Sequence, residues 1–403
     1  MTEHRVERLG IEGDGLAAGV RIPFSLPGEV WSGEPDADGR LADGVLVTPS
    51  DVRVKARCRH FGSCGGCSLQ HAGDGFLAEW KADVVRRALG AHGLETEIRP
   101  ALSSPPASRR RAVFTGVRTR KTATTGFHAR RSDTVVAVPD CQVLRPEIME
   151  ALPVLDGLTR MAATRTRAVR MSVLLSPVGL DVSVEDAREL DVDLRARLGT
   201  FAGGPVARLV WNGEPVWQER APFQEFGAAR VVPPPGGFLQ ATAEGEAALV
   251  EAVLDIAWDA RRVVDLFAGC GTFSLPLAAR AEVHAVEGLK ASIRALDAGW
   301  RGATGLKRVT TEVRDLFRRP LLEAELDGFD VAVVDPPRAG AQAQVERIAA
   351  SKLGRVAMVS CDPVSFARDA KILVVAGFEI RWVQPVDQFI WTGHVEMVAE
   401  FVR

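Results

Sequence analysis

The 403-residue chain has no tyrosine, and aromatic residues make up only 6% of it. It also lacks long apolar runs: the longest uncharged stretches, such as 171–180 and 372–378, fall well short of the roughly 18–20 residues that a membrane helix needs. The first residues have no apolar core of a signal peptide, so we expect a cytoplasmic location and no membrane partner. With 46% apolar and 25% charged residues, the composition excludes disordered and fibrous classes.

The chain has almost no net charge, −2 at pH 7, but the charge is unevenly distributed. Residues 1–51 carry four basic and ten acidic side chains, whereas residues 52–131 carry sixteen basic and five acidic ones. A basic segment inside a near-neutral chain favours an anionic partner. A solvated charged face is the alternative, which charge alone does not exclude.

Cysteine is scarce, with six residues, and a cytoplasmic chain of this size needs no disulfides. Three of them, Cys58, Cys64 and Cys67, are closely spaced, and Cys141 follows 74 residues later. Four thiolates suit either zinc or an iron–sulfur cluster. Structural zinc sites more often have two C-x-x-C pairs, and only one is present, so we favour a 4Fe-4S cluster. Basic residues around the cysteines, mostly arginines, would suit a phosphate backbone.

Turn signals and composition divide the chain into three predicted domains. Residues 1–51 have short β-like runs separated by glycine turns, which predict a small and shortened β-barrel. Residues 52–235 form a central α+β domain with the cysteine cluster and a helix over 76–89, and consecutive prolines mark its end. In residues 236–403, apolar strands at 263–267, 283–287, 331–335, 356–360 and 395–401 alternate with helical stretches. This alternation predicts an α/β fold with a doubly wound parallel sheet.

A glycine-rich turn follows the first of these strands. It contains Asp265, Gly269 and Gly271, and Glu287 ends the next strand, where a carboxylate can bind ribose hydroxyls. The spacing differs from the dinucleotide motif G-x-G-x-x-G and resembles the D-x-x-x-G-x-G form of S-adenosylmethionine (SAM) methyltransferases. A plain strand–turn–helix is the alternative, and the placement of Glu287 favours the nucleotide site.

Three further motifs lie at predicted strand ends. Asp335 begins an acid-Pro-Pro-Arg sequence, which lines the substrate pocket in many methyltransferases of nucleobases and amides. Cys361 ends the next strand and is a candidate nucleophile, with a buried apolar cysteine as the alternative. Glu396 enters the last strand, as a general base or as a solvated edge-strand glutamate.

Taken together, these motifs resemble the bacterial RNA (uracil-C5)-methyltransferases over nearly the whole chain. The resemblance includes the N-terminal glycine-rich stretches 10–15 and 26–29, the cysteine cluster, residues 238–240, the glycine turn, and residues 335–338, 360–363 and 394–396. It implies a TRAM-like, OB-type barrel in residues 1–51 and a Rossmann-like SAM-dependent methyltransferase domain in residues 236–403.

The resemblance also implies residue roles. Cys361 would be the nucleophile and Glu396 the general base. Contacts to SAM would come from Gln240, Phe267, Thr272, Glu287, Asp315 and Asp335, and ligands of the 4Fe-4S cluster would be Cys58, Cys64, Cys67 and Cys141. The transfer-RNA branch of the family typically lacks the cluster and the TRAM domain. The favoured substrate is therefore 23S ribosomal RNA, with tRNA as the alternative, and no obligate protein partner is expected.

Three positions depart from the family pattern, which has asparagine where Thr242, Thr272 and Asp362 stand. The charge of Asp362 would raise the pKa of the neighbouring thiol. Two other functions are alternatives to the enzyme. An inactive RNA-binding assembly factor would not need Cys361 and Glu396, and DNA cytosine-C5 enzymes place their Pro-Cys nucleophile differently and lack the cysteine cluster.

Overall fold

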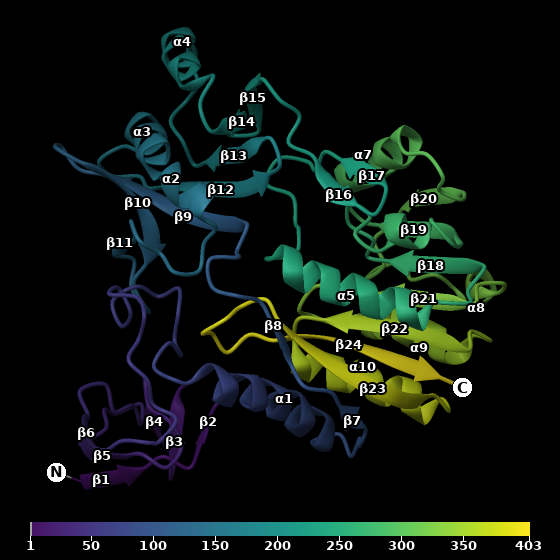
Figure 1. The fold of residues 1–403 in the computed structure, drawn as a ribbon, viewed down its shortest axis with the longest axis horizontal. Helices are drawn as coiled ribbons and strands as arrows, with labels where there is room; N and C mark the ends of the chain where they lie inside the picture. Colours follow the sequence, from purple (N-terminus) through teal and green to yellow (C-terminus); the bar gives the residue numbers. More distant parts are fainter. Residues whose placement is uncertain (1) are drawn as a thin grey trace.

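A nine-stranded sheet fills the C-terminal half of the protein, whose computed structural model describes residues 2–403 (Figure 1). The strands run, in spatial order, β20 (Val309–Val313), β19 (Glu282–Glu287), β18 (Arg262–Leu266), β21 (Val331–Val334), β22 (Arg355–Ser360), β24 (Glu396–Val402), β23 (Glu379–Asp387) and β7 (Glu97–Ile98), and β8 (Leu102–Ser103) also pairs with β23. The first five are parallel, so the predicted α/β class with a doubly wound sheet is confirmed.

The strand predicted at 395–401 is antiparallel, which corrects the expectation of an all-parallel sheet. It forms β24, which pairs antiparallel with both β22 and β23. A parallel neighbour needs a crossover of a dozen or more residues. Only residues 388–395 separate β23 from β24, so the connection is a hairpin and the strand reverses.

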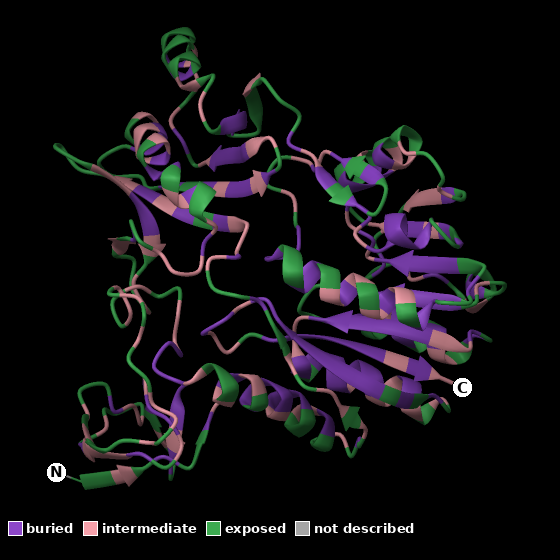
Figure 2. Ribbon diagram, viewed as in Figure 1, coloured by how far each residue is buried: buried purple, intermediate pink, exposed green. Residues whose placement is uncertain are grey.

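Helices cover both faces of this sheet. Successive side chains of a strand point to opposite faces, and because the central strands are mostly apolar, both faces must be buried. On one face, Val263 packs in a cluster with α5 (Ala243–Ile256), α6 (Ser274–Leu277) and α7 (Lys290–Gly302). On the other face, Val264 packs with α1 (Asp74–Gly90), α8 (Glu323–Leu326), α9 (Gln342–Ala350) and α10 (Pro363–Val375). Figure 2 shows the central strands largely buried between these layers. None of the helices within residues 2–403 is long and apolar enough to cross a membrane.

A second, seven-stranded sheet occupies the middle of the chain. Its order is β11 (Val135–Ala137), β10 (Ala123–His128), β9 (Arg111–Arg118), β12 (Val169–Ser176), β13 (Gly179–Glu185), β14 (Val206–Trp211) and β15 (Glu214–Gln218). Helices α2 (Pro146–Glu150), α3 (Leu152–Ala162) and α4 (Val192–Leu198) contribute to its separate core around Phe114 and Trp211. The hairpin of β16 (Gln224–Phe226) and β17 (Ala229–Val231) then leads into the larger sheet, against which Val231 packs.

The N-terminal segment forms two small antiparallel sheets. One contains β1 (Thr2–Arg5), β5 (Val30–Gly33) and β6 (Val45–Thr48), and the other contains β2 (Arg8–Leu9), β3 (Gly15–Ala17) and β4 (Val20–Ile22). A small core of Val6, Ala17, Ile22 and Leu41 lies between them. Met1, the first residue of the predicted domain 1–51, lies outside the described residues.

A buried ion pair joins α1 to the end of β23. Lys81 Nζ lies 2.5 Å from Asp387 Oδ1, and both side chains are almost completely buried. The Lys81 ammonium also donates to the Phe389 carbonyl at 3.1 Å. Burial lowers the pKa of Lys81, whereas the charge of Asp387 and its hydrogen bond raise it.

We expect Lys81→Met to lower the free energy of unfolding by about 3–5 kcal/mol, because it leaves the Asp387 carboxylate buried and unpaired. Urea denaturation followed by circular dichroism measures this loss. Arg301→Met is the matched control, since it removes an exposed pair with Asp297 and should leave the unfolding midpoint unchanged. Equal midpoints for the two variants would contradict the assigned role of the ion pair.

Candidate active site

The glycine turn after β18 holds the carboxylate of Glu287. The backbone of Gly269 has φ +54° and that of Gly271 has φ +98°, both in the left-handed region. A Cβ on Gly271 would come within 2.9 Å of two leucine side chains, whereas one on Gly269 would enter open space. The N–H of Gly269 donates to Glu287 Oε2 at 3.1 Å and that of Leu289 to Oε1 at 2.7 Å. The turn therefore fixes the carboxylate beside an open approach to the backbone.

Two phenylalanines form an aromatic pair near this turn. The rings of Phe267 and Phe317 have centroids 5.4 Å apart, and Phe317 is 49% exposed. Phe267 has φ +64°, a conformation that is costly for a bulky residue and that clusters at functional sites. Asp315 lies two residues beyond β20 and accepts from the Phe317 N–H at 3.0 Å. The two rings contact each other, so one exposed aromatic face lies in the same part of the sheet edge as the Glu287 carboxylate.

The strand register brings the catalytic candidates to the same edge of the sheet. Ser360 pairs with Met397, so the next residue, Cys361, lies near Glu396 at the beginning of β24. On the other side, β21 pairs in parallel with β22 and ends one residue before Asp335. Burial raises the pKa of the Cys361 thiol to about 11, and the charges of Glu396 and Asp335 add to this rise. The thiol is therefore protonated in the RNA-free protein.

The two carboxyl groups at this edge are both hard to ionise. Burial raises the pKa of Glu396 to about 7, while the charge of Arg111 and a hydrogen bond from Gln388 lower it. Burial, the charge of Glu396 and that of Asp265 raise the pKa of Asp335 well above its usual range. A carboxylate that titrates near neutral pH is suited to general-base catalysis.

Gln240 reaches this edge from the segment before α5, and its side chain is buried. Its Oε1 accepts from Gln388 Nε2 at 2.8 Å, and the same nitrogen donates to Glu396 Oε2 at 2.5 Å. The structure thus connects two sequence-predicted residues through Gln388, which the sequence did not single out. Thr272 lies half-buried in the glycine turn.

Two of the departures from the family pattern act as helix caps. Asp362 Oδ1 accepts from the backbone N–H groups of Val364 and Ser365 at the start of α10. Its charge raises the pKa of Cys361, as expected, but less than burial and the two nearby carboxylates do. The Thr242 hydroxyl accepts from the Gly245 N–H at 3.1 Å and caps α5.

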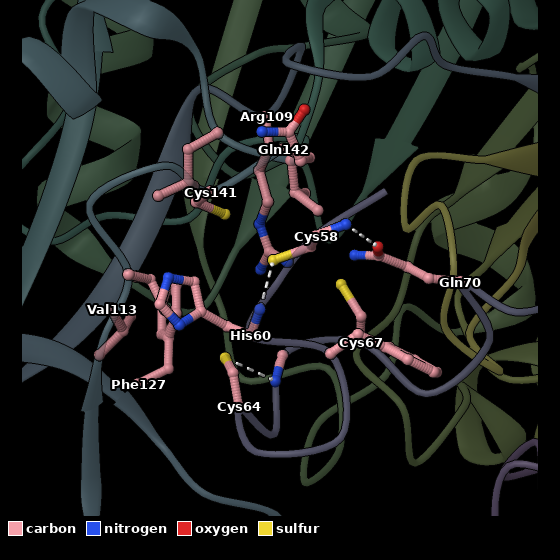
Figure 3. A pocket seen from close by; sticks show the side chains of 15 residues that line it. Cys58, His60, Cys64, Cys67, Gln70, Arg109, Val113, Phe127, Cys141 and Gln142 are labelled. Atoms are coloured by element: carbon pink, nitrogen blue, oxygen red, sulfur yellow. Dashed lines mark hydrogen bonds between the residues drawn. The ribbon is translucent and has the colours of Figure 1, made fainter. Parts of the chain in front are cut away.

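The four predicted cluster cysteines line one cavity of about 250 Å³ (Figure 3). Its other walls are mostly apolar and include Phe61, Val113, Phe127, Val138, Val143 and Leu144. Backbone N–H groups of His60 and Gly66 donate to the sulfurs of Cys58 and Cys64, both at 3.4 Å. Such donors stabilise thiolates more than neutral thiols.

Burial and the charges around this cavity determine how easily its cysteines ionise. Burial raises the pKa of Cys67 to about 12 and also raises the pKa of Cys64 and Cys141. Four thiolates here therefore need cationic partners, and the half-buried Arg109 is one. Within residues 2–403, no group of three or more His, Cys, Asp or Glu side chains is arranged so that it could hold a metal ion.

Comparison with known proteins identifies the family. A family profile described as tRNA (Uracil-5-)-methyltransferase matches residues 233–401. A protein named 23S rRNA (uracil(1939)-C(5))-methyltransferase RlmD, from Nitrosococcus oceani, is 31% identical over 428 aligned residues, which cover 98% of this chain and 95% of that protein. The chain belongs to the RNA (uracil-C5)-methyltransferase family. The resemblance that the sequence motifs predicted is thus confirmed.

Other members are similar along their whole length. An uncharacterized RNA methyltransferase from Caulobacter vibrioides is 43% identical, and the alignment covers all of both chains. The solved structure of Pyrococcus abyssi tRNA (uracil-54, C5)-methyltransferase in complex with S-adenosyl-L-homocysteine matches with a TM-score of 0.79 over 99% of both chains, at 23% identity. The second likeness shows that the family fold extends through the N-terminal and central parts of this chain.

Proposed function

We propose that this protein transfers a methyl group from SAM to C5 of a uridine in RNA and forms 5-methyluridine. The observation that carries the proposal is the meeting of Cys361, Glu396 and Asp335 at one sheet edge, next to the turn that holds Glu287. A thiol nucleophile, a carboxyl group that titrates near pH 7 and a fixed carboxylate near an aromatic pair together suit this reaction.

Uracil C5 is a weak nucleophile, so the thiol of Cys361 has the first role. Its sulfur loses its proton to water, forms a bond to C6 and turns the ring into an enolate whose C5 can attack an electrophile. SAM, when bound, would supply an electrophilic methyl group, its S–CH3 bond breaking to leave S-adenosylhomocysteine. Glu396 then accepts the C5 proton, the bond from sulfur to C6 breaks, and the thiolate of Cys361 is released.

The donor-binding residues divide into three groups in this proposal. The Glu287 carboxylate would bind the ribose hydroxyls, and Phe267 and Phe317 would hold the adenine. Gln240, Thr272 and Asp315 would complete the contacts, with Asp335 between donor and uracil.

The target base must leave its stack to reach Cys361, at a cost of a few kcal/mol. Phe238 is 62% exposed and lies under the Arg111 guanidinium, 4.5 Å from the ring centroid. We propose that this pair stacks on an unstacked base near the site, since aromatic faces and arginine planes both stack on RNA bases. Residues 1–51 and 52–235 would form the rest of the RNA surface as separate domains, although α1 packs on the catalytic sheet.

We propose 23S rRNA as the substrate because the relative named as a 23S enzyme aligns over 98% of this chain. The structure of an enzyme named for tRNA matches 99% of the chain, so the N-terminal part does not by itself separate the two substrates. Tritiated methyl transfer to purified 23S rRNA and to unmodified tRNA decides between them. Label in 23S rRNA alone supports the proposal, and label in tRNA alone overturns the choice of substrate.

We also propose that Cys58, Cys64, Cys67 and Cys141 bind a 4Fe-4S cluster. Methyl transfer from SAM needs no electron, so a bound cluster would cross-link the 58–67 segment to Cys141. Protein purified anaerobically should contain about four irons per chain and absorb broadly near roughly 400 nm. Cys67→Ser should lose this iron, and Cys270→Ser, whose thiol lies outside the cavity, should keep it. Stoichiometric zinc without iron would contradict the assignment.

The proposed base predicts the pH dependence of turnover. The pKa of Glu396 is raised to about 7, so the carboxyl group is protonated below that pH and ionised above it. Because only the ionised form can accept the C5 proton, kcat should rise with pH through about 7. A kcat profile measured with saturating RNA and SAM tests this. A profile that falls as pH increases through 7 would argue against Glu396 as the base.

A further inference from the structure

Gln388 occupies a buried position between the base and the donor-binding amide. It is 1% exposed and lies in the loop between β23 and β24. Its Nε2 donates to Glu396 Oε2 at 2.5 Å and to Gln240 Oε1 at 2.8 Å, and its Oε1 accepts from the Thr242 N–H at 3.2 Å. Both amide protons and one oxygen lone pair are therefore used.

These partners allow the Gln388 amide only one orientation. The Thr242 backbone N–H can only donate, so it requires the amide oxygen, and an ionised Glu396 can only accept, so it requires the nitrogen. This orientation commits the oxygen of Gln240 to Gln388. The NH₂ of Gln240 is then its remaining polar group, a donor suited to an oxygen of the methyl donor.

The loop around Gln388 is fixed by a helix outside the catalytic segment. Asp387 pairs with the buried Lys81 of α1, and the Phe389 N–H donates to Asp387 Oδ1 at 2.9 Å. Gly245 at the start of α5 leaves the space that Gln388 fills, since a Cβ there would come within 2.1 Å of Gln388 Cγ. The Lys81–Asp387 ion pair and the space at Gly245 together fix the position of the Gln388 amide.

Four groups face the Glu396 carboxylate from four elements. Arg111 of β9 and the Gln388 amide stabilise its charge, and Asp335 after β21 and Cys361 after β22 lie near it. Of the two stabilising groups, only Gln388 makes a hydrogen bond to it. Losing that bond leaves a buried carboxyl group that is harder to ionise.

We propose that Gln388 is a positioning residue that couples the proton-accepting carboxylate of Glu396 to the SAM-binding amide of Gln240. The inference rests on the proposed function, because Glu396 is the base only in that reaction. Because its side chain is buried and both of its donors are used, Gln388 acts through its neighbours: it sets the orientation of one amide and the charge of one carboxylate.

The test compares Gln388→Met, which keeps the length but removes both donors, with Gln384→Met on β23. Gln384 is also buried, but its amide donates to the Pro100 and Pro385 carbonyls, away from the base. For Gln388→Met we expect the kcat midpoint to rise by about one pH unit, because a hydrogen bond to a charged group is lost. We expect SAH, added alone in calorimetry, to bind about tenfold more weakly. Gln384→Met should keep both values.

A second variant, Gln388→Glu, fills the same space and places a second carboxyl group against Glu396. It should also raise the kcat midpoint, because two adjacent carboxylates cannot both ionise easily. An unchanged midpoint and SAH affinity in a folded Gln388→Met protein would overturn the proposal. Unfolding of both Gln388 variants beside a folded Gln384→Met protein would assign Gln388 a structural role instead.

The same measurements distinguish a failure of the role of Gln388 from a failure of the proposed function. A wild-type chain that binds SAH but methylates no uridine in RNA would refute the function. The SAH affinity of Gln388→Met would still decide whether Gln388 orients Gln240.

Discussion

Replacing Cys361 with alanine is expected to abolish methyl transfer, with kcat lowered on the order of 10⁴-fold or more. Without the sulfur, no bond forms at C6, and C5 stays too weak a nucleophile to attack a methyl group. The proposed donor contacts at Glu287 and Phe267 do not include Cys361, so SAH affinity should be unchanged. Tritiated methyl transfer and SAH calorimetry on the same preparation measure both effects.

A serine variant distinguishes the loss of the nucleophile from the loss of side-chain volume. Cys361→Ser keeps a small polar side chain at the end of β22, so a loss of activity there cannot come from an unfilled space. Oxygen at this position is a poorer nucleophile toward C6 than sulfur, and its activity should stay near that of the alanine variant. Substantial turnover by Cys361→Ala would exclude covalent catalysis through this residue.

Glu396→Gln is expected to stop the reaction after methylation and to trap RNA on the enzyme. Addition and methyl transfer do not need the carboxylate, whereas release needs removal of the C5 proton. Turnover should fall by about 10²–10⁴-fold, the usual contribution of a general base. A denaturing gel should show a slow band that contains protein, RNA and one tritiated methyl group.

A matched control lies on the same strand. Glu400 of β24 is half-buried and accepts a hydrogen bond from Trp382 Nε1 at 3.0 Å, so Glu400→Gln makes the same chemical change away from the site. It should turn over normally and leave no band. Multiple turnovers without a band for Glu396→Gln would mean that another group accepts the proton.

The sequence located Cys361 correctly at a strand end because buried apolar runs reveal parallel strands, and these place their carboxyl ends at one edge. The same signal cannot reveal strand direction, since a run of buried apolar residues looks the same in a parallel and an antiparallel strand. The position of Glu396 depends on strand direction, because this residue begins its strand. In an all-parallel sheet it would lie at the opposite edge from Cys361; the antiparallel β24 brings it to the site.

Contacts between distant segments explain what the sequence did not show. Gln240 and Gln388 are 148 residues apart, and Lys81 and Phe389 are 308 apart, so no local spacing predicts that they meet. Phe317 follows a short strand, β20, whose sequence has no long apolar run. These residues become visible only when the sheet order places β20 beside β19 and α1 against the catalytic core.

The most direct test of the account is mass-spectrometric mapping of 5-methyluridine in ribosomal and transfer RNA from a strain that lacks this gene. We predict that the modification disappears at a site in 23S rRNA and returns with the wild-type gene but not with Cys361→Ala. An unchanged 5-methyluridine content in both RNA classes would contradict the proposed function.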